Sequence, residues 1–166
     1  MKTFDLEERV AAAKRLFKEE GYNCCQAVVL AYADLFDLDM HTAAAISSGF
    51  GGGMGRMREV CGSVSGMVIL AGLMCPADNP SDKAVRTANY ALVQEVGNEF
   101  RSINGSIICK ELLGLVPKEK SGSIPTESPV PSDRTAEYYK KRPCEELVGI
   151  SARIIGKKLL SEINKK

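Results

Sequence analysis

Residues 60–74 read VCGSVSGMVILAGLM. This stretch is apolar on nearly every side of a helix, so we expect it to form the central helix of the protein. Ser65, Gly66 and Gly72 interrupt the apolar run, which is also too short to span a bilayer, and no membrane insertion is expected. Gly62 and Gly66 lie four residues apart, a spacing that permits a close helix crossing, either within one subunit or between the subunits of a homodimer.

Helical patterns continue on both sides of this stretch. The expected helices cover Phe4–Glu20, Cys24–Phe36, a short segment capped by Asp39 and ending at Ser48, Val60–Met74, a long segment capped by Ser81 and ending at Ser102, Ile107–Leu113, and Pro143–Ile163. Residues 49–55 are a glycine-rich loop, and residues 114–142 form a long Pro-rich loop. No convincing strand appears. We therefore predict an all-α fold, a compact bundle of about six or seven helices forming a single domain over residues 1–166.

The composition excludes one class of partner and indicates a compartment. Lys and Arg number 22 against 21 Asp and Glu, a net charge of +1, so no nucleic-acid partner is expected. The first residues are charged where a signal peptide would be apolar, so we expect a cytoplasmic protein. Thiols stay reduced in that compartment, and cysteines there are more often metal-binding or catalytic than disulfide-bonded. A count of six cysteines is high for such a protein.

Four of the six cysteines fall at the expected start of a helix. These helix-start cysteines are Cys24, Cys61, Cys109 and Cys144. Unpaired N–H groups and a partial positive charge at a helix N-terminus favour the thiolate, which is both the nucleophile and the metal ligand. No C-x-x-C motif occurs, and the four residues lie 35 to 48 positions apart, so only tertiary folding could assemble a shared site. The alternative is that these cysteines fill gaps between helices.

Five parts of the sequence form an ordered set: Gly21-Tyr22-Asn23-Cys24, the stretch Gly49–Arg56, Cys61-Gly62-Ser63-Val64-Ser65-Gly66, Cys109 and Cys144. With this set the chain resembles the C_GCAxxG_C_C family of redox-active proteins, which is named for four cysteines. The resemblance covers about residues 5 to 155. It implies an all-α protein in which the helix-start cysteines are the family cysteines. Ser63 stands where the family usually has Ala, and we expect its hydroxyl to change little. Cys25 also replaces a typical Ala and is expected to face the core, while Cys75 is expected to be a buried free thiol.

Three chemistries compete for the four thiols. An iron–sulfur cluster for electron transfer needs soft thiolate ligands and is the reading we favour. A thiol–disulfide oxidoreductase would use the same residues as nucleophiles, and a structural zinc site would use them as four ligands. Further contacts to a cofactor are expected from Gly51, Gly52, Gly53, Arg56 and Gly62, with Arg58 also near enough in sequence to offset negative charge. The glycine run matches no phosphate-binding pattern, and the sequence names no electron donor or acceptor.

Overall fold

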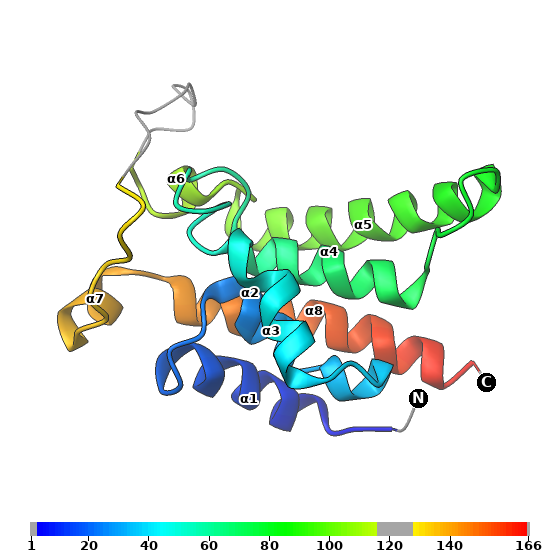
Figure 1. Cartoon of the computed structure of the whole chain (residues 1–166), viewed down its shortest axis with the longest axis horizontal. Helices are drawn as coiled ribbons and strands as arrows, with labels where there is room; N and C mark the ends of the chain where they lie inside the picture. The colour runs from blue at the N-terminus through cyan, green and yellow to red at the C-terminus, as the bar shows by residue number, and fades with distance from the viewer. Residues whose placement is uncertain (1–2, 116–127, 166) are drawn as a thin grey trace.

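The computed structural model describes residues 3–115 and 128–165, and this part of the chain is all-α, as predicted (Figure 1). Its helices are α1 (Leu6–Lys18), α2 (Cys24–Leu30), α3 (Met40–Ser47), α4 (Gly62–Met74), α5 (Lys83–Asn104), α6 (Cys109–Leu112), α7 (Ala136–Lys141) and α8 (Cys144–Ile163), with short 3-10 turns η1 (Ala33–Phe36) and η2 (Ser48–Phe50). Within these described ranges, no helix combines the length and the apolar character that crossing a membrane requires.

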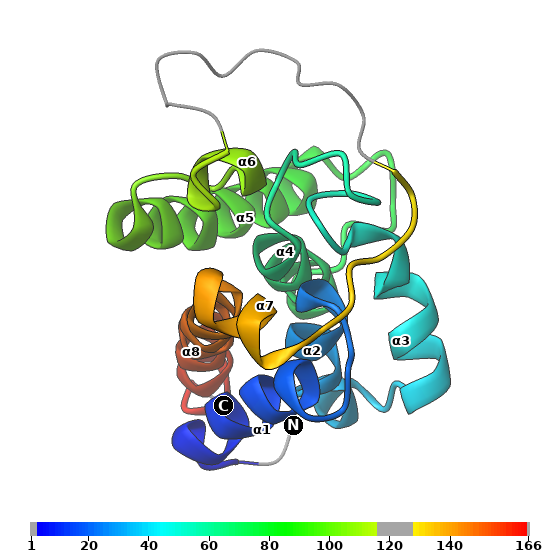
Figure 2. The same ribbon diagram turned by 90° about the vertical axis from the view of Figure 1, so that its left-hand side faces the viewer.

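Helix α4 is the central helix, as its sequence predicts. It packs against α2, α5 and α8, and α1 lies along α8 on the far side of the bundle (Figure 1). Helices α2, α4 and α8 begin at the same end of the molecule, which faces the viewer in Figure 2. The glycine-rich loop, α6 and α7 gather at that end, so several helix N-termini and this loop share one region.

Small residues allow α2 and α4 to cross closely inside the subunit. A Cβ atom added to Gly66 would lie 2.8 Å from Cβ of Val28 and 3.0 Å from the carbonyl oxygen of Cys25. Contacts this short would force the two helices apart. The glycine spacing in α4 therefore serves an intramolecular crossing, and the homodimer stays a prediction.

Three expected boundaries are wrong, each for a local reason. Helix α2 ends at Leu30 instead of Phe36, because Tyr32 leaves the helical conformation and its buried hydroxyl donates to the carbonyl oxygen of Ala152 at 2.7 Å. The N-cap of α5 is Asp82 rather than Ser81, since the Asp82 carboxylate accepts from the N–H of Val85 at 3.0 Å. The third is the end of the expected long loop, residues 114–142, because α7 lies within that range.

That loop contains a helix that the sequence pattern did not predict. Helix α7 begins after Thr135, whose hydroxyl accepts from the N–H of Tyr138. The ring of Tyr139 packs edge-on against Phe17 of α1, with 5.9 Å between the ring centroids. This contact holds the segment across the end of the bundle (Figure 2). Residues 116–127 of the expected loop lie outside the described residues.

Candidate functional site

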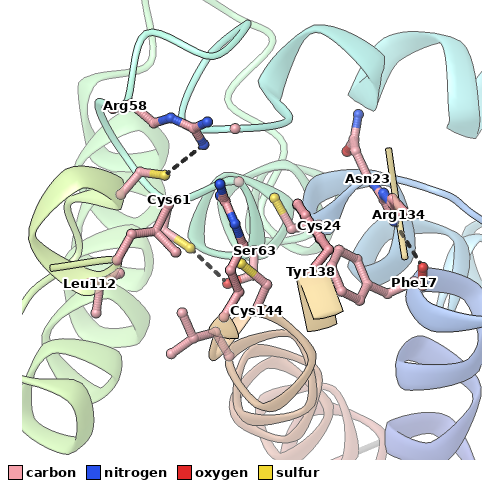
Figure 3. Close-up of a pocket in the computed structure, with 16 residues that line it drawn as sticks. Phe17, Asn23, Cys24, Arg58, Cys61, Ser63, Leu112, Arg134, Tyr138 and Cys144 are labelled. Carbon is pink, nitrogen blue, oxygen red and sulfur yellow. Dashed lines mark hydrogen bonds between the residues drawn. The ribbon is translucent and has the colours of Figure 1, made fainter. Parts of the chain in front are cut away.

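All four helix-start cysteines occupy the positions that the sequence predicts for them. Cys24, Cys109 and Cys144 are the first residues of α2, α6 and α8, and Cys61 is the N-cap of α4. The four side chains line one cavity of about 50 Å³, the cysteine cavity (Figure 3). Tertiary folding thus brings together residues that the sequence leaves far apart.

A short backbone pairing places Cys61 beside Cys109. Val60 and Ile108 form an isolated antiparallel bridge, in which the N–H of Cys61 donates to Ile107 O at 2.8 Å and the N–H of Cys109 donates to Glu59 O at 2.6 Å. Each segment is too short to show the alternation that identifies a strand in sequence. The pairing therefore had no sequence signal, although it aligns the starts of α4 and α6.

The glycine-rich loop approaches this pairing through an unusual backbone. Residues 52–56 all have positive φ, between 58° and 70°, which makes a left-handed turn. A Cβ atom on Gly53 would lie 2.6 Å from Cβ of Cys109, and one on Gly51 would lie 2.7 Å from Nδ2 of Asn23. Gly53 thus lets the loop pass close to Cys109, and Gly51 lets it pass close to Asn23.

The other residues expected to contact a cofactor divide into two groups. Gly52 and Gly62 line the cysteine cavity, and Gly62 lies directly against Sγ of Cys24. Arg56 does not line it. Its Nε donates to the carbonyl oxygen of Ser128 at 2.9 Å, and the side chain borders a neighbouring chamber. A role for any of these residues in binding a cofactor stays a prediction.

Positive side chains surround the sulfur atoms. Arg58 is 4% exposed, and its Nη1 donates to Sγ of Cys109 at 3.9 Å. Arg134 and Arg142 also line the cysteine cavity, and no Asp or Glu belongs to its wall in the described part of the chain. Of these three arginines, only Arg58 was expected near the site from the sequence. The only local signal was the basic run ending at Arg142, just before Cys144.

Burial opposes the thiolate form that the sequence analysis expected. It raises the pKa of Cys61 to about 12 and that of Cys144 to about 12, and it also raises the pKa of Cys109. The nearby Cys24 adds to each of these shifts, whereas Arg58 lowers the pKa of Cys109. Transfer of an anion out of water outweighs the attraction of a helix N-terminus here. These thiols are therefore protonated near neutral pH unless a bound group replaces the protons.

Ser63 contacts the site directly. Its Oγ lies 3.2 Å from Sγ of Cys61 and accepts a hydrogen bond of 3.0 Å from Oγ of Ser151 in α8. Both serines are fully buried. The hydrogen bond from Ser63 lowers the pKa of Cys61 against the effect of burial. The Ser63 hydroxyl, which was expected to change little, is thus a partner of a site sulfur.

The remaining two cysteines lie outside the cavity wall. Cys25 is fully buried in the core, which confirms the prediction that it faces inward. Cys75 follows the last residue of α4 and is half-buried rather than buried, in a separate cavity with Lys158 and Glu95. All six cysteines are free thiols in the structure.

Fold and site together define an all-α protein whose four helix-start cysteines line an arginine-rich cavity. The family described as "Putative redox-active protein (C_GCAxxG_C_C)" matches residues 22–158. The chain therefore belongs to this family, as the resemblance of its motifs predicts. No curated protein and no solved structure matches it.

Proposed function

We propose that the protein transfers electrons through an iron–sulfur cluster held by Cys24, Cys61, Cys109 and Cys144. The observation that carries this proposal is the convergence of four cysteines, from four different helix starts, on one cavity walled by three arginines. Four thiolates are the usual ligand set of such a cluster, and N–H groups and charge near the sulfurs tune its potential. When bound, the cluster would accept and release single electrons.

The protein supplies what a negatively charged centre requires. Arg58 contacts the sulfur of Cys109, and Arg134 and Arg142 complete a positive wall. Each helix start adds backbone N–H groups that point toward a ligand at that position. Together these groups would offset the charge of four thiolates and keep the centre away from water.

A single zinc ion is the alternative metal for four thiolates. In the ranges 3–115 and 128–165, no three His, Cys, Asp or Glu side chains are already placed to hold one metal ion, so zinc and a cluster alike would require the thiol side chains to move. A zinc site needs four sulfurs about 2.3 Å from one point, whereas a cluster spreads its ligands over several irons. The cysteine cavity is about 50 Å³, so the thiol side chains would rotate outward to admit a cluster.

Thiol–disulfide exchange is the second candidate, because the side chain of Cys24, the first residue of α2, lies against the start of α4 next to Cys61. Gly62, the residue after Cys61, lies against the sulfur of Cys24, and Cys24 is near enough to help raise the pKa of Cys61. In this reaction the two thiols would become one disulfide while a substrate disulfide takes up two electrons and two protons and becomes two thiols. The free state of both cysteines is the reduced form of such a pair, and it suits the reducing cytoplasm, which we propose as the compartment.

Anaerobic purification tests the first proposal. We expect a brown protein that contains iron and sulfide in proportion and gives an electron paramagnetic resonance signal when reduced. Replacing Cys61 or Cys109 by Ser should abolish iron binding. Cys75→Ser is the matched control, because Cys75 lies at the opposite end of α4, about 20 Å away along the helix, and this variant should keep the iron. A colourless, iron-free protein after cluster reconstitution would overturn the proposal.

The second candidate makes a different prediction. Mild oxidation should lower the number of alkylatable thiols by two, and a dithiol reductant should restore them. The Cys24→Ser and Cys61→Ser variants should lose this change, whereas Cys75→Ser should keep it. An equal thiol count before and after oxidation would contradict thiol–disulfide exchange without bearing on iron.

A further inference from the structure

A second chamber of about 370 Å³ adjoins the cysteine cavity, and the two share part of their walls. We call it the arginine vestibule. The polar and charged residues of its wall include Arg56, Arg58, Arg134, Asn23, Ser132 and Tyr138. Asn23, Arg58, Arg134 and Tyr138 belong to both walls, and Figure 3 shows Tyr138 beside Cys24 and Arg134 beside Phe17. A ligand in the vestibule would therefore lie next to the cysteines.

Three arginine side chains line the vestibule, those of Arg56, Arg58 and Arg134. Asp133 lies between two vestibule residues in sequence, but its side chain is exposed and outside the wall. Guanidinium groups that line a concave surface attract anions.

Arg134 is held in place through Nη1 alone, which leaves other hydrogen-bond donors of its guanidinium group available. Its Nη1 donates to the carbonyl oxygens of Phe17 and Tyr22, each at 2.9 Å, and its guanidinium stacks over the Phe17 ring at 4.7 Å. In the described part of the chain, Nη2 and Nε make no hydrogen bond to protein. A guanidinium fixed on one edge and free on the other is prepared for an oxyanion with two acceptor oxygens.

Polar groups without charge complete the wall. Burial raises the pKa of Tyr138, so its hydroxyl remains protonated and can donate a hydrogen bond to an anion. The hydroxyl of Ser132 accepts from Nη1 of Arg56 at 3.2 Å and leaves its own proton for another acceptor. The vestibule thus combines hydrogen-bond donors of three chemical types around one space.

We propose that the arginine vestibule binds a tetrahedral oxyanion, either free or as the phosphate group of a small molecule, and holds it beside the cysteine cavity. A chamber of about 370 Å³ is larger than a free oxyanion and falls in the size range of small-molecule sites. The arginines carry this inference, since the glycine run matches no phosphate-binding pattern. The inference goes beyond electron transfer and concerns a chamber next to the cysteines.

Calorimetric titration of the full chain tests the proposal with two probes, inorganic phosphate and phenyl phosphate, against sodium chloride at matched ionic strength. We expect saturable binding of phosphate and none of chloride. Arg134→Gln and Arg56→Gln should each weaken it at least about fivefold through the loss of one close charge. Arg86→Gln removes an exposed arginine of α5 outside both walls and should change nothing. Tighter binding of phenyl phosphate would identify a phosphorylated molecule as the ligand, and equal or weaker binding a free oxyanion.

Because Arg134 also holds two carbonyl groups, thermal unfolding must show that its variant is folded. If the Arg134→Gln protein is not folded, the Arg56→Gln protein provides an independent result. Two outcomes would overturn the proposal: no saturable phosphate binding by the wild type, or wild-type affinity in the folded arginine variants.

Alkylation of the reduced, chelator-treated chain tests the position of the vestibule. Iodoacetate is an anion and iodoacetamide is neutral, and each forms a sulfur–carbon bond as iodide leaves. Their rate ratio should favour iodoacetate at Cys24 by about five- to tenfold over Cys75, whose cavity holds two Lys and two Glu. Phosphate should reduce this preference. Equal ratios at the two cysteines would place the anion elsewhere and overturn the inference, whereas the iron assay would be unaffected.

Discussion

The sulfur of Cys24 lies against Gly62 so closely that a Cβ atom at position 62 would overlap it. The two residues are the first of α2 and the first of α4. The same hypothetical Cβ would lie 2.8 Å from the carbonyl oxygen of Phe50, at the start of the glycine-rich loop. One missing methyl group therefore lets two helix starts and the loop meet.

Gly62→Ala should disrupt this meeting point. We expect a loss of about 2 kcal/mol in the free energy of unfolding, because the added methyl has no space and must displace Cys24. Gly72→Ala is the matched control on the same helix, where nothing lies within 4 Å. That change should stabilise the protein by about 0.5–1 kcal/mol, as alanine is the better helix former. Urea denaturation measures both, and equal stability of the two variants would contradict the prediction.

Stability should fall in alkaline solution because two buried thiols resist ionisation. The folded-state pKa values of Cys61 and Cys144 are raised to about 12, above the ordinary value of 9.0. The unfolded chain therefore loses these protons first, so the stabilisation is complete below about pH 9 and is lost as the pH rises toward 12. Ionisation of each thiol lowers the free energy of unfolding by at most about 1.4 kcal/mol per pH unit in this window.

Urea denaturation between pH 7 and 10.5, with a chelator present, measures this slope. Cys61→Ser removes one of the two titrating thiols and keeps its shape, so its slope should be smaller than that of the wild type. The comparison cancels the contributions of tyrosines and lysines that titrate in the same range. Identical slopes would show that Cys61 does not resist ionisation.

Ser63→Ala should raise the pKa of Cys61 further, since it removes the hydrogen bond that lowers it. It also takes away the acceptor of the buried Ser151 hydroxyl, so we expect a loss of about 1–2 kcal/mol in stability. The double variant with Ser151→Ala should lose less than the sum of the single losses. Thiolate absorbance as a function of pH and a double-mutant cycle in urea provide the measurements, and strictly additive losses would argue against a coupled pair.

Arg58→Gln should change the electronic properties of the site more than its shape. The guanidinium lies 3.9 Å from Sγ of Cys109 and lowers the pKa of that thiol. If a cluster is bound, loss of this positive charge should lower its reduction potential by on the order of 50 mV, because the reduced state is the more negative one. A redox titration monitored by electron paramagnetic resonance measures the change, with Arg86→Gln as control. A folded Arg58→Gln protein with the wild-type potential would contradict this role.

Local signals account for what the sequence predicts correctly. Asn23 with Gln26 forms the capping box that starts α2, and the Asp39 carboxylate caps α3. Such motifs involve only a few neighbouring residues, so helix starts, and with them the positions of the cysteines, are readable from sequence. The apolar character of residues 60–74 likewise identified the central helix.

Tertiary contacts account for what the sequence does not reveal. Helix α7 packs through Tyr139 against Phe17, more than a hundred residues away, and its own pattern is too short and too charged to predict a helix. Arg134 and Arg142 reach the cysteine cavity only because this segment folds back across the bundle. The raised pKa values of Cys61, Cys109 and Cys144 have the same origin, since burial is a property of the folded molecule and outweighs the local helix field.

The spacing of the helix-start cysteines gives any group that they bind a mechanical role. Bonds to all four sulfurs would close three consecutive chain loops and cross-link α2, α4, α6 and α8 at one end of the bundle. Such closures restrict the unfolded chain far more than the folded one, so they stabilise the folded state. Because the ligands come from residues 24 to 144, the complete ligand set exists only when nearly the whole chain has been made. Binding of the group would then be coupled to the convergence of four helix starts, and a chain that lacked the group would also lack the cross-link that ties them together.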